Sequence, residues 1–162
     1  MKIKDVMTAR SLKYCSPETN LQNAAELMKT ANCGALPVVD KENKVLGIVT
    51  DRDICLALAQ EQGAQLAKTT VGKVMPKKVH TVHVDDDISA AYKQMRTNKV
   101  GRLPVVDSDG KLKGIVSLHK LISKTMEDGA IALGQPSEPG ENLGKTIHAV
   151  TQRYTGSHAI KS

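Results

Sequence analysis

The sequence contains two copies of one pattern, and this internal repeat restricts the possible folds more than any other feature. Three short segments recur at a spacing of 67 or 68 residues: residues 34–40 (GALPVVD) as 101–107 (GRLPVVD), residues 47–50 (GIVT) as 114–117 (GIVS), and residues 6–8 (VMT) as 74–76 (VMP). Agreement in three separate segments indicates a duplicated structural unit, because a shared period is how repeat architectures show in a sequence.

Each copy predicts the same order of elements, β-α-β-β-α. After an extended piece comes an amphipathic helix, whose apolar residues have helical spacing and follow a capping residue. These faces are Leu21, Ala24, Ala25, Met28 and Ala31 after Thr19 or Asn20, and Ile88, Ala91, Tyr92 and Met95 after Asp86 or Asp87. We expect two strands and a closing helix at 36–40, 45–50 and 51–60, and again at 103–107, 112–117 and 118–126.

A strand pair covered by helices on one face cannot bury its other face alone. Two copies packed sheet to sheet, with pseudo-twofold symmetry, would bury both. The sequence therefore predicts an α+β fold built from two tandem repeats. The length of 162 residues fits this arrangement, and the absence of Trp and Phe predicts an aliphatic core.

The end of the second strand in the first copy carries the polar groups most suited to a binding site. The segment Thr50-Asp51-Arg52-Asp53 stands at the turn into the closing helix, where we expect unpaired backbone N–H groups. With a hydroxyl and a guanidinium, such a corner favours phosphate, and a carboxylate three residues after Thr50 can accept from sugar hydroxyls. The competing interpretation is that Thr50 or Asp51 is only a helix cap.

With these motifs, the chain resembles a tandem pair of CBS domains, the regulatory unit called a Bateman module, of the stand-alone bacterial or archaeal type. The resemblance rests on the Val-Met segment, the apolar-Pro-Val-Val-Asp strand and the Gly-x-Val-Thr-x-x-Asp motif. It places the first repeat at residues 1–62, a linker at 63–73, the second repeat at 74–126 and a C-terminal extension at 127–162.

The resemblance implies an adenine ligand in a cleft between the two repeats. It assigns the ribose hydroxyls to Asp53 and a phosphate to Thr50, with Arg52 close enough to help neutralise the charge. Arg102 resembles the basic position that reaches phosphate from the second repeat. The residues that would wall the base are Met7, Thr8, Ala35, Leu36 and Pro37. Ordinary core packing is the alternative explanation for each wall residue, since pockets are largely apolar.

The second copy departs from this pattern at the matching corner. Ser117 keeps a hydroxyl, but Lys120 replaces the carboxylate and His119 replaces the arginine. Lysine only donates hydrogen bonds, so it cannot accept from a ribose diol. We expect one nucleotide site per chain, and at most an anion at the second corner.

Composition favours anionic partners but not nucleic acid or membrane. The net charge is +6, yet the basic residues are dispersed and only three Tyr are available for base stacking. Cys15, Cys33 and Cys55 form no metal-binding or disulfide pattern, which indicates reduced thiols. The N-terminus lacks the apolar run of a signal peptide, and no stretch reaches transmembrane length, so we expect a cytoplasmic protein.

No residue pattern indicates catalysis or a metal site. His80 and His83 have no adjacent third ligand, and strand-surface positions explain them better than zinc. Asp85-Asp86-Asp87 is interpreted as an acidic helix N-terminus that complements the helix dipole. A nucleophile with a positioned base, a P-loop and paired carboxylates are all missing from the sequence, which predicts that the protein is not an enzyme.

The extension after residue 126 is predicted to contain a linker followed by a helix. Gly129, Gly134, Pro136, Pro139 and Gly140 interrupt any regular pattern. Beyond them, an apolar stripe indicates a helix at 141–155, formed by Leu143, Ile147, Val150 and Tyr154. Docking on its own module, a dimer contact and a partner contact all stay open, as does disorder of the isolated helix.

Three functions compete at this point. The first is a non-catalytic sensor that binds AMP, ADP or ATP, without an obligatory cofactor, and signals to an unidentified protein through altered packing. Arg52 and Arg102 favour these phosphates over S-adenosylmethionine, while NAD-type molecules and cyclic dinucleotides stay possible within the family. The alternatives are a nucleic-acid binder and a purely structural dimerisation module. The resemblance also implies a homodimer, supported by the apolar residues Leu56 and Leu58 beside Ile54.

Overall fold

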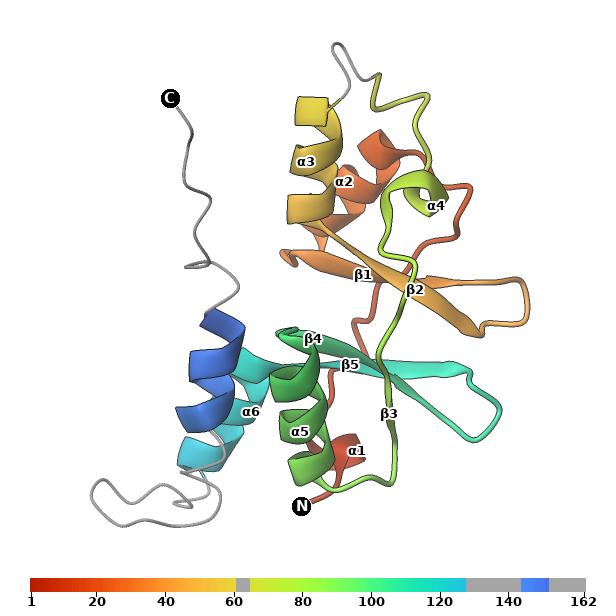
Figure 1. Cartoon of the computed structure of the whole chain (residues 1–162). Coiled ribbons are helices and arrows are strands. Elements are labelled where there is room, and N and C mark those ends of the chain that lie inside the picture. Colours follow the sequence, from red (N-terminus) through yellow and green to blue (C-terminus); the bar gives the residue numbers. More distant parts are fainter. Residues whose placement is uncertain (61–64, 128–143, 152–162) are drawn as a thin grey trace, which may run out of the picture. The chain divides into compact units, whose positions relative to one another are not determined.

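The computed structural model describes residues 1–60, 65–127 and 144–151 (Figure 1). The fold is of the predicted α+β class, with two similar arrays of a β-hairpin and helices. The elements are α1 (Ile3–Val6), α2 (Leu21–Thr30), β1 (Ala35–Val39), β2 (Val45–Thr50), α3 (Asp51–Gln60), α4 (Val71–Val74), β3 (Val82–His83), α5 (Ile88–Asn98), β4 (Arg102–Val106), β5 (Leu112–Ser117) and α6 (Leu118–Glu127). A further helix covers residues 144–151.

The chain divides into two compact units that interleave in the sequence. Unit 1 contains Met1–Met7, Val82–Leu103 and the described residues from Val116 onwards. Unit 2 contains the described residues of Thr8–Thr81 together with Pro104–Ile115, so β4 and β5 contribute to both units. The repeat boundaries predicted from the sequence at residues 62 and 73 stay predictions.

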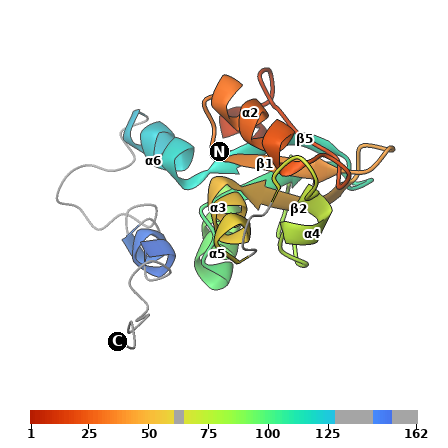
Figure 2. The ribbon, with the colours of Figure 1, turned by 90° about the horizontal axis from the view of Figure 1, so that it is seen from above.

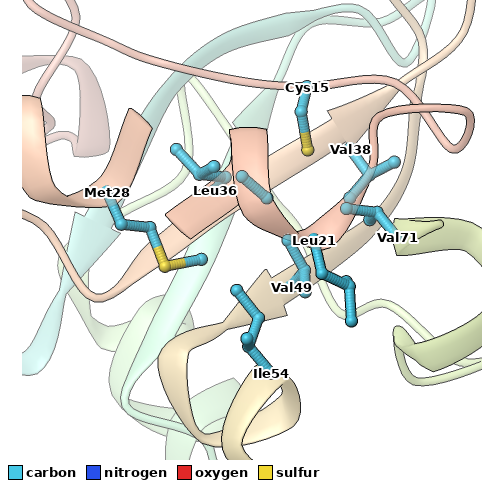
Figure 3. Packing of buried hydrophobic residues seen from close by; sticks show 9 residues of the cluster. Cys15, Leu21, Met28, Leu36, Val38, Val49, Ile54 and Val71 are labelled. Carbon is cyan, nitrogen blue, oxygen red and sulfur yellow. The ribbon is translucent and has the colours of Figure 1, made fainter. Parts of the chain in front are cut away.

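Unit 2 is built on the antiparallel pair of β1 and β2. Every residue of β1 is buried, and its register pairs Leu36 with Val49 and Pro37 with Ile48. The helices α2, α3 and α4, and Cys15 from the segment before α2, complete an aliphatic cluster (Figure 3). It comprises Cys15, Leu21, Ala24, Met28, Leu36, Val38, Val49, Ile54 and Val71. The cluster contains no aromatic ring, as the composition predicts.

Helix α2 begins where the sequence pattern places it. Asn20 is the N-cap, and its side chain accepts a hydrogen bond from the backbone N–H of Asn23 at 2.8 Å. Leu21, Ala24 and Met28 form the buried face, which matches the predicted apolar stripe. In unit 1, α5 buries Ala91, Tyr92 and Met95 in the same way after Asp87 as N-cap, although the Asp87 side chain makes no capping hydrogen bond.

The turns of both hairpins are stabilised by the same pattern of hydrogen bonds to an aspartate side chain. Asp40 Oδ1 accepts from the N–H groups of Glu42 and Lys44, and Asp107 Oδ1 accepts from those of Asp109 and Lys111. A left-handed residue follows at the matching position, Asn43 at φ 64° and Gly110 at φ 76°. Asparagine and glycine tolerate this conformation best, which explains their presence at these two positions.

The tips of the two hairpins are hydrogen-bonded to each other within unit 2. The N–H of Leu112 donates to the carbonyl of Asn43 at 2.9 Å, and the Asn43 side chain donates back to the carbonyl of Leu112 at 3.2 Å. The N–H of Val45 donates to Gly110 at 3.1 Å. The two sequence copies are therefore joined by backbone pairing as well as by side-chain packing.

The segment that leads into each copy packs on the other copy, a feature that the sequence did not indicate. The N–H groups of Ile3 and Lys4 donate to Asp86 and Val84, at 2.9 and 3.1 Å. Conversely, the N–H groups of Val71 and Gly72 in α4 donate to Thr19 and Pro17, at 2.8 and 2.9 Å. The chain thus exchanges its two leading segments.

The same exchange places Met75 against the sheet of the first copy. A Cβ on Gly47 would lie only 2.6 Å from Sδ of Met75, so any larger residue would make this flexible side chain shift. Gly47 therefore has a packing contact within unit 2.

Strand and helix boundaries differ slightly from the predicted ones. The strands β1 and β4 begin and end one residue earlier than expected, and α6 extends to Glu127. In the first copy the expected leading strand is reduced to a single parallel bridge between Cys15 and Val38, whereas the second copy has the two-residue β3. The resulting sheets contain β1-β2 and β3-β4-β5.

Several predictions for the tail fall outside the described residues. These are Leu143 and Tyr154 of the apolar stripe and the glycines and prolines of the interrupted segment. Within the described helix, Thr146 is fully buried whereas Ile147 is 37% exposed. Among the described helices, none has the length and apolarity needed to cross a bilayer.

Candidate functional site

The Thr50–Asp53 corner is a reciprocal capping box at the start of α3. Asp53 Oδ2 accepts from the backbone N–H of Thr50 at 2.8 Å and from its hydroxyl at 2.7 Å. In return, Thr50 Oγ1 accepts from the backbone N–H of Asp53 at 3.2 Å. Thr50 therefore caps α3, and the box fixes the orientation of both side chains. Whether these residues also bind a ligand stays a prediction.

The expectation that this helix end offers unpaired N–H groups to a phosphate is wrong. The N–H of Asp51 donates to the carbonyl of Gly34 at 3.3 Å, and that of Arg52 donates to Asp51 Oδ1 at 2.8 Å. With Thr50 and Asp53 paired in the box, four successive backbone donors are occupied. An anion at this corner would have to be held by side chains, because the protein itself has satisfied the helix N-terminus.

Two polar groups of the box retain capacity for a ligand. All hydrogen bonds at the half-buried Asp53 carboxylate use Oδ2, and within the described residues Oδ1 has no partner. The Thr50 hydroxyl has one proton, which it donates to Asp53. Because phosphate oxygens accept, Thr50 could bind phosphate only by turning this proton away from Asp53.

The predicted wall residues of unit 2 differ in exposure. Ala35, Leu36 and Pro37 are all buried in β1, and Leu36 is fully enclosed in the aliphatic cluster. Thr8 is exposed, and its backbone exchanges two hydrogen bonds with Ile115, at 2.8 and 3.0 Å. Contact of these residues with a ligand stays a prediction.

The remaining predicted site residues are the two arginines and Met7. Arg52 is exposed in the first turn of α3. Met7, the C-cap of α1, and Arg102, the exposed first residue of β4, belong to unit 1. The structure therefore groups Thr50, Arg52 and Asp53 at one corner, and the roles of Met7 and Arg102 stay predictions.

The matching corner of the second copy is only half formed. The N–H of Lys120 donates to Ser117 Oγ at 3.2 Å, as Asp53 does to Thr50. Lysine cannot return the bond, so neither the backbone N–H nor the hydroxyl of Ser117 gains a carboxylate acceptor. Both His119 and Lys120 are exposed.

Two of the three aspartates before α5 form ion pairs with lysines, and the third accepts a backbone hydrogen bond. Asp85 lies 2.8 Å from the Lys4 ammonium, and Asp87 lies 3.3 Å from that of Lys2. The hydrogen bond and charge of Lys4 lower the pKa of Asp85. Asp86 Oδ2 accepts from the N–H of His83. The two ion pairs hold the segment around α1 against the residues before α5, within unit 1. The three aspartates therefore have specific partners, in addition to any interaction with the helix dipole that the sequence predicts.

The two histidines and three cysteines occupy unrelated positions. Burial, with a smaller effect from Lys78, lowers the pKa of His80, while His83 Nδ1 accepts from the N–H of Asp85 at 3.2 Å. Burial also raises the pKa of Cys15 to about 11, and Cys33 and Cys55 are exposed. In the described part of the chain, no three His, Cys, Asp or Glu side chains are grouped to hold a metal ion.

Unit 2 also has an open groove that the sequence did not indicate. Its volume is about 460 Å³, and it lies between the segment Tyr14–Glu18 and the turn after β1, where Val39, Asp40, Lys41, Glu42 and Leu46 complete its lining. None of these residues belongs to the Thr50–Asp53 corner. Apart from Val39 in β1 and Leu46 in β2, the lining residues lie in irregular segments, which hydrophobic periodicity does not predict.

The predicted dimer residues of α3 are exposed. Leu56 and Leu58 have 46% and 42% of their surfaces accessible, while Ile54 beside them is buried in the aliphatic cluster.

Comparison with known proteins gives one consistent result. A family model described as CBS domain matches residues 3–60 and 71–127. YlbB of Bacillus subtilis is 40% identical over 147 residues, which cover 87% of this chain and 94% of YlbB. CBSX2 from Arabidopsis thaliana, solved in complex with AMP, is 29% identical with a TM-score of 0.69, covering 79% of this chain and 98% of CBSX2.

A third similar structure is the CBS domain pair of MJ0100, solved with 5′-methylthioadenosine and S-adenosyl-L-methionine. It is 28% identical with a TM-score of 0.69, covering 80% of this chain and 98% of that pair. The two matched regions of the family model correspond to the two copies in the sequence and together include most of the chain. The protein therefore belongs to the CBS-domain family and contains a tandem pair of these domains.

Proposed function

We propose that this protein is a non-catalytic regulatory module that binds an adenosine phosphate at the Thr50–Asp53 corner. Binding would alter the packing of the domain pair, and a partner protein would detect the change. Such signalling requires a ligand that binds two conformations with different affinity, since equal affinity shifts no population. The preferred ligand is AMP or another adenosine phosphate, ADP or ATP.

The ligands of two similar proteins support the adenosine part of this proposal. CBSX2 was solved with AMP, and the MJ0100 pair was solved with two molecules that both contain adenosine. The basic side chains of Arg52 and Arg102 favour a phosphorylated ligand over S-adenosylmethionine, because guanidinium groups pair well with phosphate. Met7, Thr8, Ala35, Leu36 and Pro37 are proposed to surround the base.

The observation that carries the proposal is the Asp53 carboxylate of the capping box. One oxygen is held by Thr50, so the carboxylate is oriented before any ligand arrives, and the other oxygen can accept from a ribose hydroxyl. When phosphate binds, the Thr50 hydroxyl would donate to it instead of to Asp53. The Thr50 N–H would still hold the carboxylate, so the corner would exchange one hydrogen bond rather than unfold.

The proposed partner surface includes the exposed side chains of Leu56 and Leu58 on α3. Both are large and apolar, and a homodimer formed through this helix would remove them from water. Sedimentation of the wild type and of Leu56→Lys at micromolar concentrations tests the homodimer, and equal masses for the two proteins at monomer size would contradict it.

Calorimetry with three ligands and three variants tests the site. Adenosine, AMP and S-adenosylmethionine share the ribose, whereas AMP alone carries a phosphate. Asp53→Asn should weaken all three ligands about tenfold or more, since hydrogen bonds to a charged group contribute about 1.5–3 kcal/mol. Arg52→Ala should weaken AMP selectively. Asp51→Asn is the matched control and should leave affinities unchanged.

A thermal-shift screen provides the decisive negative result. A ligand at 100 times its dissociation constant should stabilise the fold by about 2.7 kcal/mol. If no adenosine-containing ligand raises the melting temperature, the sensor proposal fails and a structural role replaces it.

A further inference from the structure

The groove of unit 2 lies at the opposite end of the first hairpin from the Thr50–Asp53 corner. Leu46, which lines the groove, is the second residue of β2, whereas Thr50 ends that strand. The turn between β1 and β2 forms one wall of the groove, and Figure 2 shows this turn (orange) extending past α2 and α3. With a volume of about 460 Å³, the groove has the size of a binding pocket and is separate from the proposed nucleotide site.

The lining of the groove exposes apolar surface to water. Six large apolar side chains are exposed among the described residues, and two of them, Tyr14 and Leu46, line this groove. Their exposed fractions are 52% and 41%, while Cys15 and Val39 beside them are buried. Exposed apolar side chains that gather in one hollow indicate a contact surface, whereas single ones scattered over a protein do not.

The charged side chains of the groove are mostly acidic, although the chain as a whole is basic. Glu18, Asp40 and Glu42 line the groove together with a single ammonium group, that of Lys41, whereas the net charge of the chain is +6. Among the described residues, Glu18, Glu42 and Lys41 form no ion pair. Asp40 uses Oδ1 to bind the backbone of its own turn. The groove therefore favours a positively charged group.

The wall formed by residues 14–18 also offers backbone hydrogen-bonding groups. The N–H and carbonyl of Cys15 are bonded to β1, at 3.0 and 2.9 Å. Neighbouring residues of an extended segment use opposite edges, so Tyr14 directs its N–H and carbonyl away from β1, and neither has a partner in the described part of the chain. The edge ends at Ser16, because Thr19 pairs with both its N–H and its carbonyl at 3.1 Å. An extended chain beside Tyr14 could therefore gain two backbone hydrogen bonds.

We propose that this groove is a docking site for an extended segment of a partner protein, in which an apolar side chain is flanked by lysine or arginine. The apolar side chain packs against Tyr14 and Leu46, and the basic side chains pair with Glu18 and Glu42. The backbone of the segment pairs with the N–H and carbonyl of Tyr14, as in recognition by strand addition. A small cation would satisfy the carboxylates but would leave these two backbone groups unpaired, so a peptide is the better occupant.

Amide NMR spectra of the full chain, titrated with synthetic peptides, test the docking. The probe is a short acetylated peptide of alternating valine and lysine, and the comparison peptide has glutamate in place of each lysine. The valine–lysine peptide should shift the signals of residues 14–18 and 39–46 and should bind about tenfold more tightly than the glutamate peptide. Since the chain is positively charged, non-specific attraction would favour the glutamate peptide. Shifts confined to other residues, or equal affinity for the two peptides, would overturn the proposal.

Substitutions at exposed positions separate the acidic lining from the apolar lining. Glu42→Lys should weaken binding of the valine–lysine peptide about fivefold, because it reverses a charge that the lysines approach. Glu26→Lys is the matched control, since it makes the same change on the exposed surface of α2, outside the groove, and should keep the wild-type affinity. Leu46→Thr keeps a residue that favours strands but removes apolar surface, and should also weaken binding about fivefold. Equal affinities for Glu42→Lys and Glu26→Lys, or wild-type affinity for Leu46→Thr, would contradict the proposal.

Two further probes distinguish the possible occupants. A valine–lysine peptide methylated at its backbone nitrogens should bind about tenfold more weakly, because it cannot donate to the carbonyl of Tyr14. Hexylamine represents a small apolar cation, and if it shifts the same signals with the affinity of the peptide, the groove is a small-molecule site and the proposal fails. Peptide binding should be unchanged in Asp53→Asn, so a failure of the proposed nucleotide site would leave this result intact.

Discussion

The two strand-to-helix corners started from the same sequence pattern and now differ in one decisive group. In the first copy, Thr50 and Asp53 hold each other by three hydrogen bonds. In the second copy, Ser117 and Lys120 share a single bond, from the backbone of Lys120. Both corners cap a helix, but only the first has a carboxylate at the third helical residue.

This difference distinguishes the residue that is needed to cap the helix from the residue that is proposed to bind a ligand. A helix start needs only one side-chain acceptor, and Ser117 supplies it without help from the third helical residue. The carboxylate at Asp53 is therefore not needed to begin a helix, although it strengthens the cap of α3. A carboxylate beside an arginine suits the proposed sugar-phosphate site, so the comparison agrees with the expectation of one nucleotide site per chain.

The largest expected difference between the two corners is the loss of stability when the third helical residue, Asp53 or Lys120, is replaced by alanine. Asp53→Ala leaves the half-buried Thr50 without its acceptor and should destabilise the protein by about 1–2 kcal/mol, in addition to abolishing AMP binding. Lys120→Ala removes no capping bond, because Lys120 contributes its backbone, and should be nearly neutral. Urea unfolding of both variants measures the difference, and equal losses would show that the reciprocal box contributes nothing.

Restoring the carboxylate should make the second corner like the first. In Lys120→Asp, the new side chain could accept from the N–H and hydroxyl of Ser117, which should stabilise α6 by about 0.5–1 kcal/mol. Urea unfolding checks the gain, with Lys120→Asn as the uncharged control. Calorimetry reports whether the number of bound AMP molecules rises from one to two; a stoichiometry of one would mean that His119 or the surroundings also exclude the ligand.

The two copies also differ at a buried strand position. Cys15 pairs with Val38 where the second copy, 67 residues later, has Val82, and both side chains are buried. Burial raises the pKa of the Cys15 thiol from 9.0 to about 11, so the folded state binds its proton more tightly than the unfolded state. The contribution of the protonated Cys15 thiol to the free energy of unfolding is complete below pH 9 and should be lost as the pH rises towards 11.

Cys15→Val should remove that loss of stability in alkaline solution. Urea unfolding at pH 8 and pH 10.5 compares the variant with the wild type, and Cys33→Val serves as the exposed control. An identical pH response in wild type and Cys15→Val would mean that the thiol is not protected by folding.

The smallest expected effect concerns the ion pairs that attach α1. The pKa of Asp85 lies below its ordinary value of 3.8 because Lys4 favours the charged form. The pair therefore stabilises the docked state above that pH and is lost as the pH falls below it. Both groups are exposed, so the effect is small and screened by salt.

Amide exchange of residues 1–7 measures the attachment. Asp85→Asn should accelerate exchange slightly at low salt and not at 1 M salt, where the pair is already screened. The contacts described for Val71 and Gly72 of α4 are backbone hydrogen bonds between uncharged groups. Amide exchange of the segment around α4 should therefore show no such dependence on salt.

Local patterns predicted most of the secondary structure. The bounds of β2, β5 and α3 agree with the sequence-based ones, because a short apolar run followed by a capping hydroxyl identifies a strand-to-helix turn. The buried face of α2 was equally predictable from spacing, whereas the cap was narrowed only to Thr19 or Asn20, and the structure shows Asn20.

Features that depend on distant partners were not predictable in this way. The pairing of Ile3 with Asp86 involves no local pattern, so the exchange of leading segments stayed hidden. The donors at the start of α3 were expected to be free because the sequence does not show that Gly34 and the Asp51 side chain would accept from them. The resemblance identified the Thr50–Asp53 corner, but the hydrogen bonds within it could be found only from the structure.

The exchange of leading segments also sets an order for folding during synthesis. The groups that pair with Ile3 and Lys4 belong to Asp86 and Val84, which are translated some eighty residues later. Synthesis proceeds at about 5–20 residues per second, so the N-terminal segment waits several seconds for its partners. Neither unit is complete before the second copy has been translated, because each unit contains segments of both copies.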